Sequence, residues 1–227
     1  MRTLVVGDIH GARKALGQCL ERAHFDLDND TLISLGDVVD GWPESRECIE
    51  LLLRVKNRVQ ILGNHDKWFY EWAREPREML WKSQGGEATF NSYVPQSHID
   101  FFRDSYAIYM DDEKSQLFVH GGLDPKLSIE EQKLETLIWD RSLANKAWMT
   151  AKHQKDYKYT EYKEIYIGHT PTSSFGEDKV PLKVCNVWMM DTGAGWTGGK
   201  LSIMDVDTKE YWQSDVVDTL YPGVKSR

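Results

Sequence analysis

Three apolar runs near the N-terminus each end in glycine, and each is followed by a polar residue at a regular interval. The runs and the residues that follow them are 3–7 with Asp8, 31–36 with Asp37, and 58–63 with Asn64. The polar residues are separated by 29 and 27 positions, each about the length of one βαβ unit. Because the carboxyl ends of parallel strands meet at one edge of a sheet, this spacing predicts that the three residues lie together.

Helical patterns occupy the two intervals between these runs. Residues 12–23 carry apolar side chains at helical spacing. Pro43 and the acidic residue after it are typical of the first turn of a second helix, which continues to Leu53. The alternation of strands and helices indicates an α/β fold.

The rest of the chain contains four further strand patterns and one irregular stretch. Strands are predicted at residues 116–120, 164–168, 184–190 and 200–206. Residues 66–115 are less regular and begin with an aromatic-rich helix, so we expect a cap-like insertion there, beside the site. Because the chain contains no convincing interdomain linker, residues 1–227 are predicted to form one domain.

Composition narrows the set of partners. The 227 residues carry a formal net charge of −8, which argues against stable nucleic-acid binding, since that binding needs clustered cationic side chains. The basic and aromatic stretch at residues 143–163 is therefore interpreted as a solvated helix or loop. No apolar stretch approaches the roughly 18 residues of a membrane span, so no membrane partner is expected.

The N-terminus and the cysteines indicate a cytoplasmic location. The sequence enters a strand pattern at once and has no signal-peptide composition. Its three cysteines, Cys19, Cys48 and Cys185, are widely spaced and lie in helix or strand patterns. They are predicted to be buried free thiols in a reducing compartment.

Six residues near the ends of the strand patterns offer the donor types that two divalent cations need. The predicted ligands are Asp8, His10, Asp37, Asn64, His120 and His169. Asp37 can bridge both cations because its carboxylate has two oxygen atoms. The mixed shell suits Mn²⁺, Fe or Zn²⁺ and offers too few oxygens for Ca²⁺. The remaining histidines are expected to be surface or structural residues: His24, His98 and His153.

Five short segments in a fixed order carry a family resemblance. They are residues 7–11, 36–41, 63–66, 119–122 and 168–171, which read GDIHG, GDVVDG, GNHD, VHGG and GHTP. In this order they resemble the calcineurin-like metallophosphoesterases. Within that family the chain looks most like the small bacterial and phage phosphoprotein phosphatases of the PPP type and the symmetrical diadenosine tetraphosphatases. The resemblance implies a central β-sandwich flanked by helices, with a small cap insertion.

The resemblance also implies a mechanism. It implies a metal-dependent phosphatase with two metal ions, Mn²⁺ foremost, and in-line attack on phosphorus by a hydroxide that bridges them. His65 is implied as the general acid, held by Asp40, and Arg141 as a phosphate-binding residue together with Asn64 and His65. An imidazolium beside a carboxylate can donate a proton near neutral pH. Asp191, in a late Asp-Thr-Gly turn, is expected to be structural or to lie behind the ligands.

Three positions bear on the substrate. Gly41 stands where the phosphatases carry a second phosphate-binding arginine, and Lys67 or a cap residue is the candidate replacement. Asp66 stands where phosphoprotein phosphatases usually carry glutamate and the tetraphosphatases carry aspartate. Asp40 is retained, whereas the tetraphosphatases tend to lose the acid at that position. These features point in different directions.

The leading interpretation is a serine/threonine protein phosphatase that hydrolyses phosphomonoesters. The alternative is a pyrophosphohydrolase of diadenosine tetraphosphate, whose bases would stack on an aromatic-rich cap. The tryptophans of this cap are Trp42, Trp68, Trp72 and Trp81, and packing in the core is the competing explanation for most of them. A catalytically silent binding module is the third interpretation. The expected partner is therefore a phosphorylated protein or a small phosphorylated or nucleotide substrate, and the oligomeric state stays open.

Overall fold

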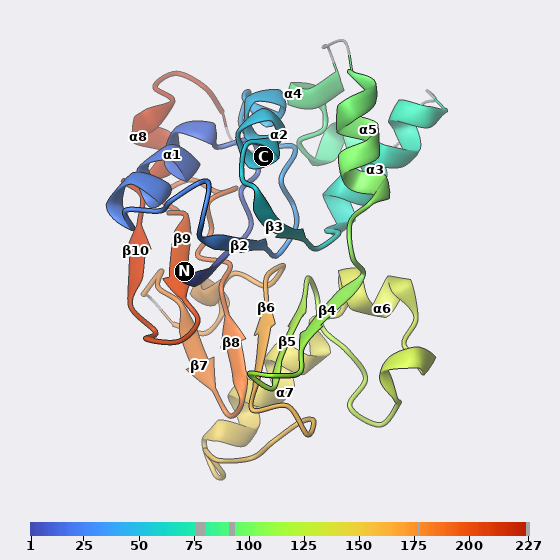
Figure 1. Ribbon diagram of the computed structural model, residues 1–227, viewed down its shortest axis with the longest axis vertical. Helices are drawn as coiled ribbons and strands as arrows, with labels where there is room; N and C mark the ends of the chain where they lie inside the picture. The colour runs from blue at the N-terminus through green and yellow to red at the C-terminus, as the bar shows by residue number, and fades with distance from the viewer. Residues whose placement is uncertain (76–79, 91–93, 177, 226–227) are drawn as a thin grey trace.

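Two five-stranded β-sheets pack against each other at the centre of the computed structural model, which describes residues 1–75, 80–90, 94–176 and 178–225 (Figure 1). The first sheet has the order β10 (Tyr211–Gln213), β9 (Ser202–Asp205), β1 (Thr3–Val6), β2 (Thr31–Ser34) and β3 (Asn57–Gln60). The second sheet has the order β4 (Ile108–Asp111), β5 (Gln116–Val119), β6 (Glu164–Ile167), β8 (Val187–Met189) and β7 (Leu182–Val184).

Helices cover both outer faces of the paired sheets (Figure 1). The helices on the side of the first sheet are α1 (Arg13–Arg22), α2 (Ser45–Leu53), α3 (Asn64–Arg74), α4 (Glu87–Phe90), α5 (Gln96–Arg103) and α8 (Val217–Leu220). Those on the side of the second sheet are α6 (Leu134–Trp139) and α7 (Ser142–Ala151). Short 3₁₀ helices form at Leu80–Gln84, Ile129–Glu131 and Thr172–Ser174. The predicted α/β class and the predicted β-sandwich flanked by helices are confirmed.

The side chains of each strand alternate between two apolar layers. On β1, Leu4 and Val6 pack toward the helices, whereas Val5 belongs to the cluster between the sheets. Phe118 of β5 and Tyr166 of β6 enter the same central cluster, where their rings stack with centroids 4.8 Å apart. This alternation follows from the two-residue period of a strand, and it gives both faces of each sheet a buried role.

The strands that precede the candidate ligands are parallel neighbours. β1 pairs with β2 and β2 with β3, all in parallel, as the spacing of the first three apolar runs predicts. β5 and β6 form a second parallel pair in the other sheet. The carboxyl ends of these strands therefore gather the segments that follow them.

The single strand predicted at residues 184–190 is wrong. The structure forms a hairpin instead, in which β7 and β8 pair antiparallel through a turn at Cys185 and Asn186. Cys185 has a φ of 55°, a left-handed conformation that a non-glycine residue does not announce in sequence. Its thiol is half-buried, so the prediction of buried free cysteines holds for Cys19 and Cys48 but not for Cys185.

The predicted cap-like range, residues 66–115, contains most of α3 together with α4 and α5 in its described part. Its last section is part of the sandwich, because β4 pairs antiparallel with β5 at the edge of the second sheet. Gly85 and Gly86 lie between a short 3₁₀ helix and α4.

Residues 143–163 begin in α7 and continue as largely exposed turns, as expected of a solvated segment. No helix in the described ranges combines the length and the apolar character that crossing a membrane requires. The cytoplasmic location stays a prediction.

Candidate active site

The six predicted ligands lie together where the carboxyl ends of the parallel strands of both sheets meet. All six are buried. They are Asp8 and His10 after β1, Asp37 after β2, Asn64 after β3, His120 after β5 and His169 after β6. The two sheets thus contribute donors from opposite sides of one site.

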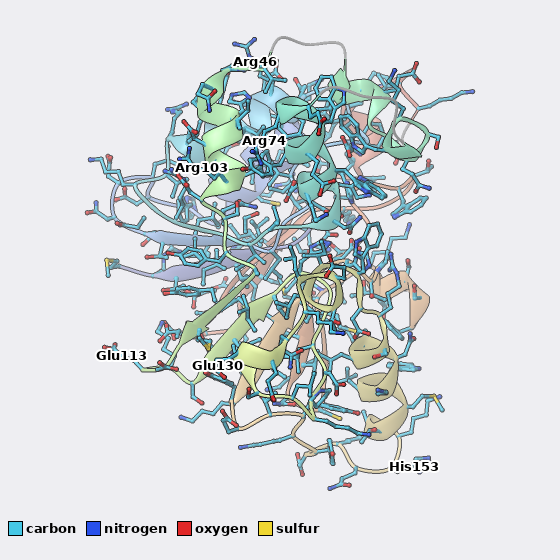
Figure 2. All side chains as sticks on the ribbon, turned by 90° about the vertical axis from the view of Figure 1, so that its right-hand side faces the viewer. Arg46, Arg74, Arg103, Glu113, Glu130 and His153 are labelled. Atoms are coloured by element: carbon cyan, nitrogen blue, oxygen red, sulfur yellow. The ribbon has the colours of Figure 1, made fainter. Side chains whose placement is uncertain are left out.

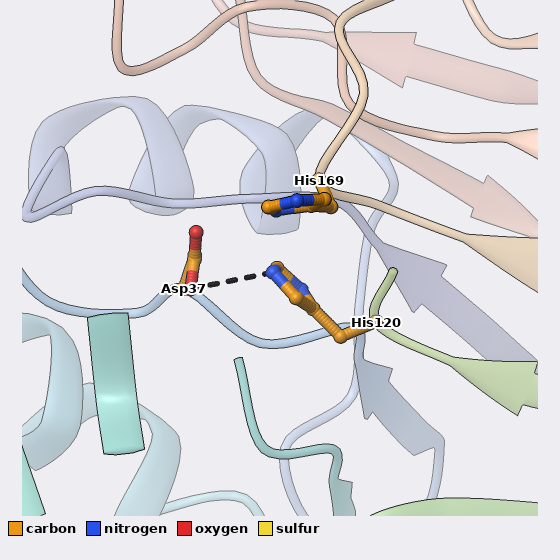
Figure 3. Close-up of side chains that lie close together, drawn as sticks. All are labelled: Asp37, His120 and His169. Carbon is orange, nitrogen blue, oxygen red and sulfur yellow. Dashed lines mark ion pairs between the residues drawn. The ribbon is translucent and has the colours of Figure 1, made fainter. Parts of the chain in front are cut away.

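Asp37 belongs to two groups of potential metal ligands. In each group, Asp8–His10–Asp37 and Asp37–His120–His169, the ligand atoms lie within 4.8 Å of one another. Figure 3 shows the second group, with the Asp37 side chain close to both imidazole rings. His120 Nε2 lies 3.4 Å from Asp37 Oδ1, and His10 Nε2 lies 3.7 Å from Asp37 Oδ2. The two carboxylate oxygens therefore face different histidines, as sharing between two cations requires.

Backbone carbonyls orient two of the imidazole rings. His120 Nδ1 lies 2.8 Å from the carbonyl oxygen of Leu35, and His10 Nδ1 lies 3.3 Å from that of Val39. A carbonyl can only accept, so the proton of each neutral ring belongs on Nδ1 and leaves Nε2 as the donor atom for a metal. His120 Nε2 also lies 3.1 Å from Asn64 Oδ1, which places the amide oxygen beside the same position.

His169 provides the clearest fit to a metal. Its Nε2 is buried and has no hydrogen-bond partner among the described residues. Burial and then the charge of His120 lower the pKa of His169 to about 3, so the ring is neutral near pH 7. A neutral imidazole with an unpaired buried nitrogen beside carboxylates is a suitable ligand, and the donor set as a whole fits two divalent cations.

The carboxylates differ in their electrostatic environments. Burial and then the charge of Asp191 raise the pKa of Asp8 well above its usual value. Burial also opposes ionisation of Asp37, but His120 and His65 outweigh it and hold the pKa of Asp37 well below the usual value. The same partnership raises the pKa of His120 to about 9, although burial alone would lower it. A cation beside Asp37 would take the place of that imidazole proton, because metal ligation requires a neutral ring.

Two glycines let carboxylates come close to neighbouring backbone. A Cβ atom added at Gly63 would lie 2.2 Å from Asp37 Oδ1, and one added at Gly168 would lie 2.2 Å from Asp8 Oδ1. Distances this short do not occur for real side chains, so only glycine fits at either position.

His65 and Asp40 form the predicted pair. His65 Nδ1 lies 2.8 Å from Asp40 Oδ2, and both side chains are buried. His65 also lines the cavity that the candidate ligands share. With Nδ1 directed at Asp40, the opposite nitrogen Nε2 is the one that can serve a substrate.

The cavity has a volume of about 290 Å³, and Arg141 forms part of its wall. Arg141 Nη1 donates to the carbonyl oxygen of His169 at 2.6 Å, which places the guanidinium beside the candidate ligands. Lys67, a candidate replacement for the missing arginine at Gly41, pairs with Glu71 instead and does not line the cavity. Among the described residues, Arg141 is the one arginine or lysine that lines the cavity.

The tryptophans at the cavity are largely different from those considered in the sequence. Core packing accounts for three of the four, Trp42, Trp72 and Trp81, which are buried. Trp68 lines the cavity, together with Trp139 and Trp196, which are 41% and 45% exposed. Trp139 lies two positions before Arg141, a residue that the resemblance singles out, whereas nothing in the sequence distinguished Trp196.

A wall of aromatic rings joins the two sides of the site. The ring centroids of His65 and Trp68 lie 5.1 Å apart, those of Trp68 and Trp139 5.0 Å, and those of Trp139 and His169 5.8 Å. All three contacts have an edge-to-face geometry, which quadrupole attraction favours.

Asp66 has a structural role that the sequence did not reveal. Its carboxylate accepts hydrogen bonds from the backbone N–H groups of Val38 at 2.8 Å and Gly63 at 3.1 Å, and so joins the Asp37 loop to the start of α3. Burial and then the charge of Asp37 raise the pKa of Asp66 to about 7. Asp191 lines the cavity near Asp8 and accepts a hydrogen bond from the Gly193 N–H at 2.9 Å.

The other three histidines lie away from the cavity, as predicted. His24 and His153 are exposed. Figure 2 shows His153 at the lower end of the molecule, just beyond α7. His98 is buried with its Nε2 4.0 Å from Glu50 Oε1. None of the three lines the cavity.

The family follows from comparison with known proteins. The sequence model of the calcineurin-like phosphoesterases matches residues 1–211, so the chain belongs to that family. Membership of this family agrees with the phosphoesterase activity that the resemblance implied. A crystal structure of a metallophosphoesterase from Sphaerobacter thermophilus has the same fold, with a TM-score of 0.60 at 18% identity over 95% of this chain and 89% of that one.

The chain is similar to named proteins of two kinds. A symmetrical bis(5'-nucleosyl)-tetraphosphatase of Stutzerimonas stutzeri is 31% identical over 58% of this chain and 48% of that protein. The chain thus spans about half the length of the first relatives that it matches. The corresponding protein of Pseudomonas fluorescens is 25% identical over 92% of this chain and 93% of its own. Serine/threonine-protein phosphatase 1 of Salmonella typhimurium is 36% identical over 37% of this chain and 38% of its own.

We predict that Gly63→Ala lowers the affinity for Mn²⁺ by about 10- to 100-fold, the usual effect of disturbing residues that orient a metal ligand. The added Cβ would displace Asp37, whose backbone nitrogen lies 2.3 Å from the new atom. Titration calorimetry of the folded variant measures the change. Gly17→Ala is the matched control, because its Cβ would meet only Arg13 Nη1 at 3.5 Å. Equal affinity in both variants would contradict the account of Asp37.

Proposed function

We propose that the six donors hold two divalent cations, Mn²⁺ foremost, and that the chain uses them to hydrolyse phosphorus–oxygen bonds. The observation that carries this proposal is the sharing of Asp37 between two ligand groups whose atoms lie within 4.8 Å of one another. Asp8 and His10 would complete one group, and Asn64, His120 and His169 the other. When bound, two such cations supply positive charge for the phosphoryl oxygens and lower the pKa of the attacking water.

Arg141 is proposed to orient the phosphoryl group. One guanidinium nitrogen is held by the carbonyl oxygen of His169 at 2.6 Å, which fixes the plane of the group. The remaining N–H groups of a guanidinium form a rigid fork that matches phosphate oxygens. Arg141 would therefore hold the phosphoryl group in line for attack, because it binds the phosphoryl oxygens that stay on phosphorus throughout the reaction.

His65 is proposed as the general acid. Its Nδ1 is 2.8 Å from Asp40 Oδ2, so the carboxylate fixes the ring orientation and leaves Nε2 to donate a proton to the leaving oxygen. The ring lines the cavity, within reach of a bound phosphoester.

We propose a dinucleoside polyphosphate as the substrate class. Similarity to a symmetrical tetraphosphatase over nine-tenths of both chains supports this choice. The geometry supports it too, because a cavity of about 290 Å³ holds the reacting phosphates while bases remain outside. Trp139 and Trp196 present half-exposed rings at the cavity, where flat bases can stack.

A serine/threonine phosphoprotein is the second candidate, favoured by one observation. The His65–Asp40 pair is intact, and an alcohol leaving group needs a proton donor more than a nucleotide leaving group does. The shorter match to a serine/threonine phosphatase is consistent with this candidate.

The substrate proposal predicts a higher kcat/KM for diadenosine tetraphosphate than for a phosphoserine peptide, with Mn²⁺ present and a chelated sample as control. Trp196→Ala should lower the dinucleotide value about tenfold to hundredfold, since base stacking on an aromatic residue contributes about 1–3 kcal/mol. Tyr211 has a similarly exposed ring but does not line the cavity. Tyr211→Ala should therefore leave kcat/KM unchanged for both substrates. Preference for the phosphopeptide would move the assignment to the second candidate, and no chelator-sensitive turnover would favour the silent binding module.

The acid role predicts that His65→Asn lowers kcat by about 10²–10⁴-fold with phenyl phosphate, whose leaving group is poor. The loss should be much smaller with para-nitrophenyl phosphate, whose leaving group departs without a proton. His24→Asn serves as the control, because His24 is exposed with a φ of 49° and asparagine tolerates that conformation. Equal losses of kcat on both substrates would exclude proton donation by His65.

A further inference from the structure

The Asp40 carboxylate is fully buried, so hydrogen bonds must replace its water shell. Its Oδ2 faces His65 Nδ1 at 2.8 Å and also accepts from the indole nitrogen of Trp81. Its other oxygen, Oδ1, accepts from the hydroxyl of Thr89 at 2.8 Å. Of the three described side chains that bond to this carboxylate, two come from one segment, residues 80–90.

The same segment also fixes the backbone of Asp40. The Asp40 N–H donates to Thr89 Oγ1 at 3.2 Å and to Ser45 Oγ at 3.0 Å. The two hydroxyl oxygens, those of Thr89 and Ser45, lie 3.0 Å apart. Asp40 has a φ of 72°, an uncommon conformation for a residue with a side chain, which persists only where the surroundings enforce it. Thr89 therefore bonds to both the main chain and the side chain of Asp40.

The segment is itself fastened in place. The Gly41 N–H donates to the carbonyl oxygen of Gly85 at 3.1 Å. A Cβ added at Gly86 would lie 2.5 Å from the Trp81 ring, so the chain folds closely over the indole. Gln84, which lies between Trp81 and Gly85 in the sequence, lines the cavity. One short stretch of chain therefore contacts both the cavity and the partner of the general acid.

From these contacts we infer that Trp81 and Thr89 are positioning residues for the reaction, acting on His65 through Asp40. The inference rests on the acid role proposed for His65 and adds two residues that are not among the side chains lining the cavity. Without its bonds to Trp81 and Thr89, the carboxylate would turn toward other donors, and His65 Nε2 would lose its alignment with the leaving oxygen.

The test compares Trp81→Phe and Thr89→Val with wild type, each loaded with Mn²⁺, on phenyl phosphate and para-nitrophenyl phosphate. We expect kcat for phenyl phosphate to fall about tenfold to hundredfold in each variant, because each removes a hydrogen bond to a charged group. KM and the rate with para-nitrophenyl phosphate should change little. Trp72→Phe is the matched control. The ring centroids of Trp72 and Trp81 lie 5.4 Å apart, and the substitution removes the same volume of side chain as Trp81→Phe.

The outcomes separate this inference from the proposed function. If both variants lose the two activities equally, or match Trp72→Phe, Trp81 and Thr89 are merely structural and the inference is wrong. If His65→Asn shows no dependence on the leaving group, the acid role fails and the inference fails with it. Circular dichroism establishes folding, and if Trp81→Phe does not fold, Thr89→Val, which is nearly isosteric, decides the result.

Discussion

The Asp37 carboxylate, buried among imidazole rings, is the constraint on which the rest of the site depends. Its two oxygens face His10 and His120, and the backbone N–H of His65 donates to Oδ1 at 2.9 Å. Burial alone disfavours a charged carboxylate, but these neighbours hold the pKa of Asp37 well below its usual value. Asp37 follows β2, which lies between β1 and β3 in the first sheet. At this place, ligands from both sheets can surround its carboxylate.

The backbone around the site is held in conformations that side chains rarely adopt. Four residues have φ values between 49° and 72°: His10, Asp37, Asp40 and His169. Each such conformation costs on the order of 1–3 kcal/mol. Hydrogen bonds between turns offset part of this cost, for example those from the N–H groups of Ile9 and His10 to the Asp37 carbonyl oxygen at 3.0 Å and 2.8 Å. These turns direct the side chains of the candidate ligands across the edge of the sandwich. Regular strands would instead direct them to the two faces of each sheet.

The sequence predicted that Asp8, Asp37 and Asn64 lie together because the signal was local: an apolar run ending in glycine and then a polar residue, repeated at the length of a βαβ unit. The other three donors were predicted from their residue types and their positions near the ends of strand patterns. It failed where tertiary packing decides. Trp42 is buried and Trp196 half-exposed, although both lie beside glycines. The turn at Cys185 lacks a glycine and was read as continuous strand. Trp81 and Thr89 reach Asp40 from 41 and 49 positions away, a separation that leaves no pattern in the sequence.

Electron paramagnetic resonance of the chain loaded with Mn²⁺ tests most directly the claim that one carboxylate joins two cations. The sharing of Asp37 between ligand groups that span no more than 4.8 Å predicts two Mn²⁺ ions per chain with an exchange-coupled spectrum. Wild-type protein that binds a single ion, or two ions with the spectrum of isolated Mn²⁺, would contradict the account.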